Sequence, residues 1–74
     1  LRTKAMTVKV VPLAVRDGIA FDLILDTGYV KQFTITDYEL RQYRASVADV
    51  IESTVLAWLA ENDYQDDEVS IIYC

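Results

Sequence analysis

The pattern that most constrains this chain is a set of three β-type segments separated by two tripeptides that each end in glycine. The segments are Thr7–Val15, Ile19–Leu25 and Tyr29–Ile35, and all are rich in β-branched and aromatic residues. The tripeptides, Arg16-Asp17-Gly18 and Asp26-Thr27-Gly28, contain the only two glycines of the chain. Three-residue hairpin loops often end in a left-handed residue, which glycine adopts without strain. We therefore predict an antiparallel three-stranded meander.

The two loops also predict the register of the strands. With three-residue loops in both hairpins, Phe21 lies opposite Leu13 on one side and opposite Phe33 on the other. A slip of one residue would move every side chain of a strand to the other face, so the match of apolar faces selects this register. The apolar face, interrupted by Lys31, then consists of Val11, Leu13, Val15, Ile19, Phe21, Leu23, Leu25, Tyr29, Phe33 and Ile35.

The other face of the predicted sheet is half apolar and carries few charges, which favours a contact with a second copy or a partner. Pro12 lacks a backbone donor, so we expect the first strand to be an edge strand with a bulge near Val10 and Val11. The residues of this face are Val10, Pro12, Ala14, Ala20, Asp22, Ile24, Val30, Gln32 and Thr34.

The second half of the chain has a helical pattern. Thr36-Asp37-Tyr38-Glu39 matches a capping box, and we expect one long helix from there to about Asn62. A final strand is expected at Glu68–Tyr73, beside either the first or the third strand. The apolar stripe of the helix, which matches the sheet face in size, consists of Leu40, Tyr43, Val47, Val50, Ile51, Thr54, Val55 and Trp58.

The predicted fold class is therefore α+β. It consists of a three-stranded antiparallel meander, one long helix packed on one sheet face and a final β-strand, in the order β-β-β-α-β. Residues 6–74 form a single domain. Residues 1–5 precede Met6 and are interpreted either as a remnant of the expression vector or as a flexible N-terminus.

Composition limits how a chain of 74 residues can be stabilised and what it can bind. Cys74 is the only cysteine and there is no histidine, so we expect a cytoplasmic protein without a disulfide, a metal or a cofactor. Without histidine, neither a Ser-His nor a Cys-His catalytic pair can form. The net charge of −5 disfavours direct binding to nucleic acid, and no apolar run is long enough to span a membrane. Oligomerisation remains as a source of stability, and we expect a homo-oligomer.

The stretch Leu23–Gly28, with the sequence LILDTG, resembles the active-site loop of retroviral-type aspartic proteases, in which each half of a homodimer supplies one aspartate. A strand, a turn with Gly18 and a second strand precede the motif, as in that family. The resemblance implies that Asp26 would be catalytic, that Thr27 would brace it and that Gly28 would let the two loops approach. The mechanism needs two such carboxylates that share a proton.

The rest of the chain departs from that family. Its C-terminal motif has a glycine where this chain has Tyr73, and no glycine follows Gly28 to build a flap over a substrate. Asp26 and Thr27 are also ordinary turn residues. We therefore interpret Asp26-Thr27-Gly28 as a turn and expect no enzymatic activity, with the half-site of a homodimeric aspartic protease as an alternative function.

The residues that we expect at a partner interface are aromatic, apolar or acidic. Tyrosine is enriched at protein interfaces, and an acidic segment can occupy a basic groove on a partner. Leu56 lies on the polar side of the predicted helix, and Leu59 flanks its core stripe. The candidates for partner binding are Tyr38, Leu56, Leu59, Glu61, Asp63, Tyr64, Asp66, Asp67 and Glu68.

Together these features predict a non-enzymatic protein–protein interaction module. In size and composition it is like small phage or bacterial inhibitors that bind a host protein complex, with an acidic surface that competes for a basic groove. Its partner would be another protein, including one that itself binds nucleic acid. A structural or assembly subunit that acts as a homo-oligomer is a further alternative.

Overall fold

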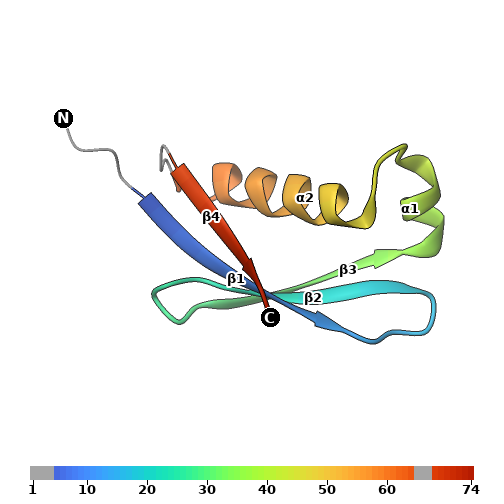
Figure 1. Ribbon diagram of the computed structural model, residues 1–74, viewed down its shortest axis with the longest axis horizontal. Coiled ribbons are helices and arrows are strands. Elements are labelled where there is room, and N and C mark those ends of the chain that lie inside the picture. Colours follow the sequence, from blue (N-terminus) through green and yellow to red (C-terminus); the bar gives the residue numbers. More distant parts are fainter. Residues whose placement is uncertain (1–4, 65–67) are drawn as a thin grey trace.

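In the described part of the chain, a four-stranded mixed sheet carries two helices on one of its faces (Figure 1). The computed structural model describes residues 5–64 and 68–74. The strand order in the sheet is β3-β2-β1-β4, and the fold is α+β as predicted. The elements along the chain are β1 (Ala5–Leu13), β2 (Gly18–Ile24), β3 (Val30–Thr36), α1 (Asp37–Gln42), α2 (Val47–Glu61) and β4 (Glu68–Tyr73).

The last strand lies beside the first strand, which decides between the two positions that the sequence left open. β4 pairs with β1 in parallel, from Ala5 opposite Glu68 to Val10 opposite Tyr73. The chain therefore crosses over the sheet from β3 to β4 by way of the helices, and β3 and β4 form its two edges.

The hairpin between β2 and β3 has the predicted register. Phe21 lies opposite Phe33 and Ile19 lies opposite Ile35. Gly28 has a φ of 94°, in the left-handed region, and its N–H donates to the carbonyl of Leu25 at 3.0 Å. The prediction of a three-residue loop that ends in a left-handed glycine is confirmed for this hairpin.

The hairpin between β1 and β2 differs from the prediction by one residue. Leu13 lies opposite Ala20 rather than Phe21, and Val10 lies opposite Leu23. The helix-facing residues of β1 are therefore the buried Met6, Val8 and Val10, and the prediction that placed Val11, Leu13 and Val15 on that face was wrong. Met6, Val8 and Val10 alternate with the polar Thr7 and Lys9. They therefore fit a half-buried strand better than the predicted face does.

Gly18 also has a different role from the predicted one. It is the first residue of β2 rather than the last residue of a loop, and the turn falls on Arg16 and Asp17. A Cβ at position 18 would collide with the carbonyl oxygen of Ile35, so glycine allows β2 and β3 to approach at this point.

Pro12 shows why β1 can occupy an inner position of the sheet. β1 lies between β2 and β4, and its pairing with β2 is continuous from Lys9 to Leu13, so the prediction of an edge strand with a bulge was wrong. The N–H of Cys74 donates to the carbonyl of Val10 at 3.0 Å, and backbone groups alternate sides along a strand. The nitrogen of Pro12 therefore faces the side of β4, beyond the end of that strand, where no ladder donor is needed.

The predicted single helix is divided into two. Thr36 and Glu39 form the expected capping box, with hydrogen bonds of 3.1 and 3.2 Å. Tyr43, however, is extended with ψ of 138°, and a second helix starts after Ser46, whose Oγ accepts the N–H of Asp49 at 3.2 Å. Ser46 is thus a second N-cap that the continuous apolar stripe concealed.

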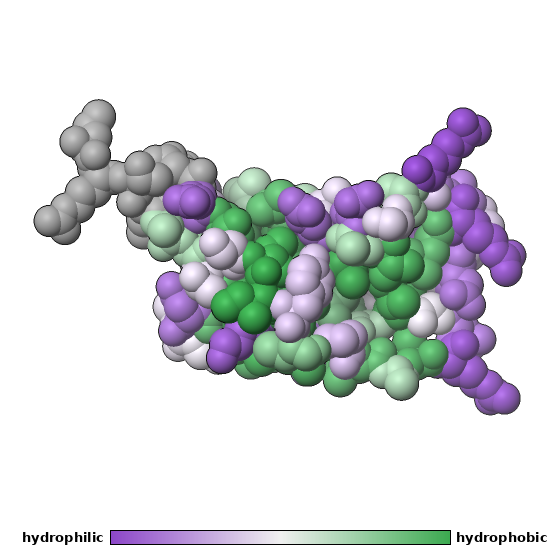
Figure 2. Space-filling view, in the orientation of Figure 1, coloured by the Kyte–Doolittle hydropathy of each residue, from purple (hydrophilic) through white to green (hydrophobic). Residues whose placement is uncertain are grey.

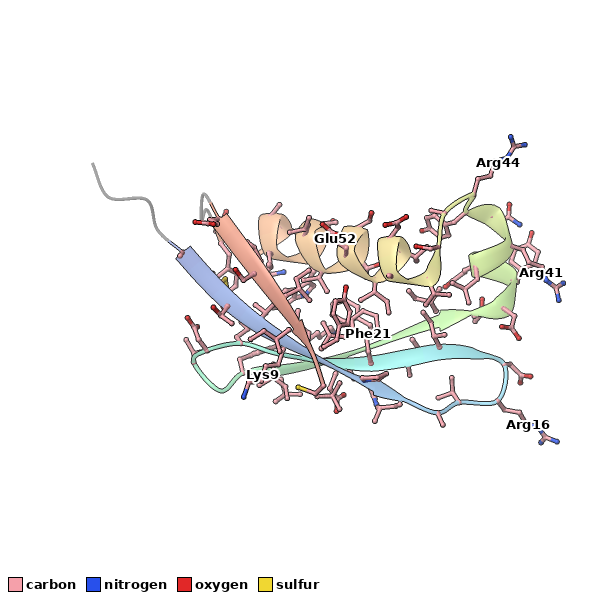
Figure 3. The ribbon with its side chains drawn as sticks, viewed as in Figure 1. Lys9, Arg16, Phe21, Arg41, Arg44 and Glu52 are labelled. Carbon is pink, nitrogen blue, oxygen red and sulfur yellow. The ribbon has the colours of Figure 1, made fainter. Side chains whose placement is uncertain are left out.

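The core lies between α2 and the sheet. Phe21 points from β2 into this layer (Figure 3). The residues of α2 that face the sheet recur at helical spacing, which is the amphipathic pattern expected of a helix that covers a sheet. The buried residues of this core cluster are Met6, Val8, Val10, Phe21, Leu23, Leu25, Ile35, Val50, Ile51, Val55 and Leu59.

Candidate functional site

An open groove runs between α2 and the edge strand β3. Its cavity volume is about 430 Å³, which is within the range of sites that hold a small ligand or a few side chains of a partner. It extends from Tyr43, which follows α1, to Glu61 at the end of α2. The lining residues are Phe33, Tyr43, Val50, Ser53, Thr54, Ala57, Trp58 and Glu61.

Small residues on α2 create the groove. Ser53, Ala57 and Glu61 are spaced four residues apart, so they lie along one side of the helix. The two short side chains at positions 53 and 57 leave the space beside Trp58 open. Thr54 donates its hydroxyl hydrogen to the carbonyl of Val50 at 2.8 Å, so its polar atom is satisfied within the helix.

Aromatic contacts fix the wall of the groove. The half-buried ring of Trp58 lies 5.9 Å from Tyr29, 6.3 Å from Phe33 and 6.0 Å from Tyr64, measured between ring centroids. Phe33 in turn stacks on the buried ring of Phe21 at 5.1 Å. Rings that are held on several sides lose little conformational freedom when a ligand binds, so this wall is pre-organised.

Sequence reasoning missed this groove because it assigned Trp58 and Tyr43 to the core stripe. Trp58 is only half buried, and Tyr43 is 52% exposed. The signal that could have identified the groove was Ser53 and Ala57, since two small residues next to a tryptophan on a helix leave its ring uncovered.

Among the predicted contact residues, the structure brings one to the groove and places another next to its wall. Glu61 lines the groove, and Tyr64 is half buried because it stacks on Trp58. Asp63 and Glu68 are exposed at the end of α2 and the start of β4. Asp66 and Asp67 lie outside the described residues.

The other three candidates lie apart from the groove lining. Tyr38, on α1, is 72% exposed, and Leu56, on α2, is 41% exposed. Leu59 is a core residue with only 2% of its surface exposed, so it is covered by the sheet and is not open to a partner.

A second hollow lies near the Asp26-Thr27-Gly28 turn, with a volume of about 260 Å³. Asp26 is exposed there, and the N–H of Tyr29 donates to Thr27 Oγ1 at 3.5 Å. A Cβ on Gly28 would meet nothing within 4 Å, so the turn is open to solvent. The lining residues are Thr7, Lys9, Ile24, Leu25, Asp26 and Gly28.

Charged groups in the described part of the chain lie at the surface, and none of the buried residues is polar. Arg16, Arg41 and Arg44 project at the α1 end of the molecule (Figure 3). Within residues 5–64 and 68–74, no group of three or more histidine, cysteine or carboxylate side chains is arranged to hold a metal ion. No helix in these ranges is both long and apolar enough to cross a membrane.

No protein-family model, curated protein or solved structure matches this chain. The function is therefore inferred from the geometry of its surfaces.

Proposed function

We propose that this chain is a non-enzymatic protein–protein interaction module that binds a segment of another protein in the groove between α2 and β3. The observation that carries this proposal is the pre-organised aromatic wall of Trp58 and Phe33 beside small residues on α2. Aromatic side chains in partly buried pockets supply much of the energy at protein interfaces. A partner side chain in this groove would cover Trp58 without a rearrangement of the core.

The backbone of β3 favours an extended partner segment. The N–H of Leu25 donates to the carbonyl of Tyr29, so the odd-numbered residues of β3 direct their backbone groups toward β2. The N–H and C=O groups of Val30, Gln32 and Thr34 consequently face away from the sheet. An added strand would pair with these groups while its alternate side chains enter the groove.

The charge of the groove and of the chain indicates which residues the partner segment contains. Glu61 lines one end of the groove, and the chain carries a net charge of −5. A segment with an apolar side chain for the aromatic wall and a Lys or Arg for Glu61 fits these two features.

The test is selection from a displayed library of random peptides, followed by affinity measurements on two matched variants. Ala57→Arg places a long side chain in the groove. Leu56→Arg places the same side chain at the preceding residue of α2, which is also exposed but does not line the groove. We expect selected peptides with an apolar residue and a basic residue, and a loss of at least about tenfold in affinity, or 1.4 kcal/mol, for Ala57→Arg alone. No selection, or an equal loss in both variants, would contradict the groove as the binding site.

A further inference from the structure

We propose that two copies of this chain pair through β4, antiparallel across a two-fold axis at Ile71, and so join their sheets into one continuous sheet. This interface is separate from the proposed function, because the groove lies at β3, the opposite edge of the sheet. The partner at the β4 edge is a second copy of the same chain.

Among the residues that the structure describes, no strand pairs with β4 on its outer side. Val10 lies opposite Tyr73, and its carbonyl accepts the N–H of Cys74, so Ile72 and Cys74 direct their backbone groups toward β1. By alternation, the N–H and C=O groups of Val69, Ile71 and Tyr73 point away from the sheet. These groups are the donors and acceptors that a further strand requires.

The side chains of β4 lack the features that protect an edge strand from pairing. Natural edges carry lysine, proline, bulges or charges that point inward. The strand EVSIIY contains none of these residues, and its one charge, Glu68, points to the face opposite the helices. Ile72 is 46% exposed and Tyr73 is 50% exposed. β4 passes in front of β1 in Figure 1, and Figure 2 shows hydrophobic residues across the middle of this side.

The strand is complementary to itself in one register. With Ile71 opposite Ile71 of the second copy, Val69 lies opposite Tyr73, and each of these pairs exchanges two backbone hydrogen bonds. Aromatic and β-branched residues then face one another on the helix side, which is a favourable cross-strand combination. Glu68 lies opposite Cys74 of the second copy, so no like charges meet. After a shift of two residues in either direction, Val69 or Tyr73 no longer lies opposite a residue of Glu68–Tyr73 in the second copy.

The dimer keeps the two turns that contain Asp26 apart. β1 and β4 separate each β2–β3 turn from the axis, so at a strand spacing of about 4.8 Å the two turns are at least about 24 Å apart along the sheet. Two carboxylates at that separation cannot share a proton as an aspartic protease requires. The two grooves lie at the far edges of the joined sheet and remain open for partners.

The register can be tested by a cross-link that only this pairing allows. Glu68→Cys would face Cys74 of the second copy at a non-hydrogen-bonded pair, where Cα atoms are about 4.5 Å apart and a disulfide fits. Within one chain these positions are about 20 Å apart along an extended strand, so they cannot bond to each other. Mild oxidation forms each S–S bond from two thiols, and the oxidant, dissolved O₂, accepts the two electrons and two protons. We expect a covalent dimer of Glu68→Cys with 68–74 disulfides in peptide mapping.

The control is Thr34→Cys, which adds an exposed thiol on β3 while Cys74 stays in place. It should form disulfide dimers no faster than the parent chain. Equal rates for the two variants, or bonds that join only like positions in Glu68→Cys, would overturn the proposed register.

A second measurement tests the dimer without cysteine chemistry. We expect the parent to sediment as a dimer, Tyr73→Pro as a folded monomer, and Val30→Pro as a dimer. Both prolines remove an N–H that points out from a sheet edge, but only position 73 lies on β4. Far-UV circular dichroism verifies that each variant is folded. A monomeric parent, or equal dissociation of the two proline variants, would contradict the proposal.

Discussion

The two edges of this sheet present the same kind of backbone with different side chains. On β3, Lys31 lies on the helix-facing side of the strand, and a groove with an aromatic wall runs beside it. On β4, Val69, Ile71 and Tyr73 lie on the helix-facing side without a charge among them, and the strand matches a reversed copy of itself. The inward lysine opposes pairing between identical β3 strands, while the groove leaves room for the side chains of a different chain. Side chains next to an edge therefore decide which strand it accepts.

The largest effect on both edges is expected from a change in the core that supports them. Phe21→Ala removes a fully buried ring that stacks on Phe33, and we expect a loss of about 3–5 kcal/mol in the free energy of unfolding. Urea denaturation followed by circular dichroism measures this loss. Peptide binding and dimerisation should be lost together, since a domain of this size has only ~3–5 kcal/mol of net stability. Val30→Ala, at a 53% exposed site, is the control and should change stability by less than about 0.5 kcal/mol.

A smaller effect that separates the two edges is expected at Gly18. Gly18→Ala would force apart β2 and β3 where the new Cβ meets the carbonyl of Ile35, with a cost of about 1–3 kcal/mol. Because Gly18 lies opposite Thr36 at the end of β3, the peptide groove should weaken while the dimer at β4 persists. Thermal unfolding, peptide titration and sedimentation on the same sample measure the three effects.

Gly28→Ala is the matched comparison for Gly18→Ala. Its φ of 94° makes alanine unfavourable, but no atom lies near the new Cβ, so we expect about 1–2 kcal/mol from the backbone alone. Equal loss of peptide binding in the two variants would show that the β3 edge does not depend on the close approach at Gly18.

The smallest effect is expected at the turn that resembles a protease loop. Asp26→Asn removes one exposed charge, and we expect less than about 0.5 kcal/mol of change in stability and no change in peptide affinity or in the dimer. Incubation with unfolded casein, followed by mass spectrometry, tests for proteolysis. Cleavage by the parent chain that is absent in Asp26→Asn would support the protease alternative instead.

Local patterns predicted those parts of the fold in which one arrangement satisfied both backbone and side chains. The β2–β3 hairpin followed from its loop and from the match of Phe21 with Phe33. The register predicted for the β1–β2 hairpin was wrong because Val10 and Val11 are both apolar. Both faces of β1 therefore carry apolar residues, and the sequence pattern does not decide between them. The role of Gly18 could not be decided from the sequence, since glycine is favoured both in turns and where two strands approach closely.

Other features depend on contacts that a local pattern does not contain. The break at Tyr43 was missed because the apolar stripe continues through it, although Ser46 is a recognisable N-cap. The position of β4 beside β1 is set by the path of the crossover over the sheet. Trp58 was correctly assigned to the sheet-facing side of the helix, but its half-exposed ring depends on how far α2 lies from β3.

The pairing of β1 with β4 determines when, during folding, the edge of the proposed dimer forms. The meander and the helices can form from segments that are neighbours in the sequence. β4, the last element, instead pairs with β1, the first element. Such distant contacts form late, because the entropy of closing a long loop must be overcome first. The proposed dimer edge is therefore created in the final step of folding. A growing chain on the ribosome would form its β2–β3 hairpin before β4, and with it the proposed dimer edge, had been synthesised.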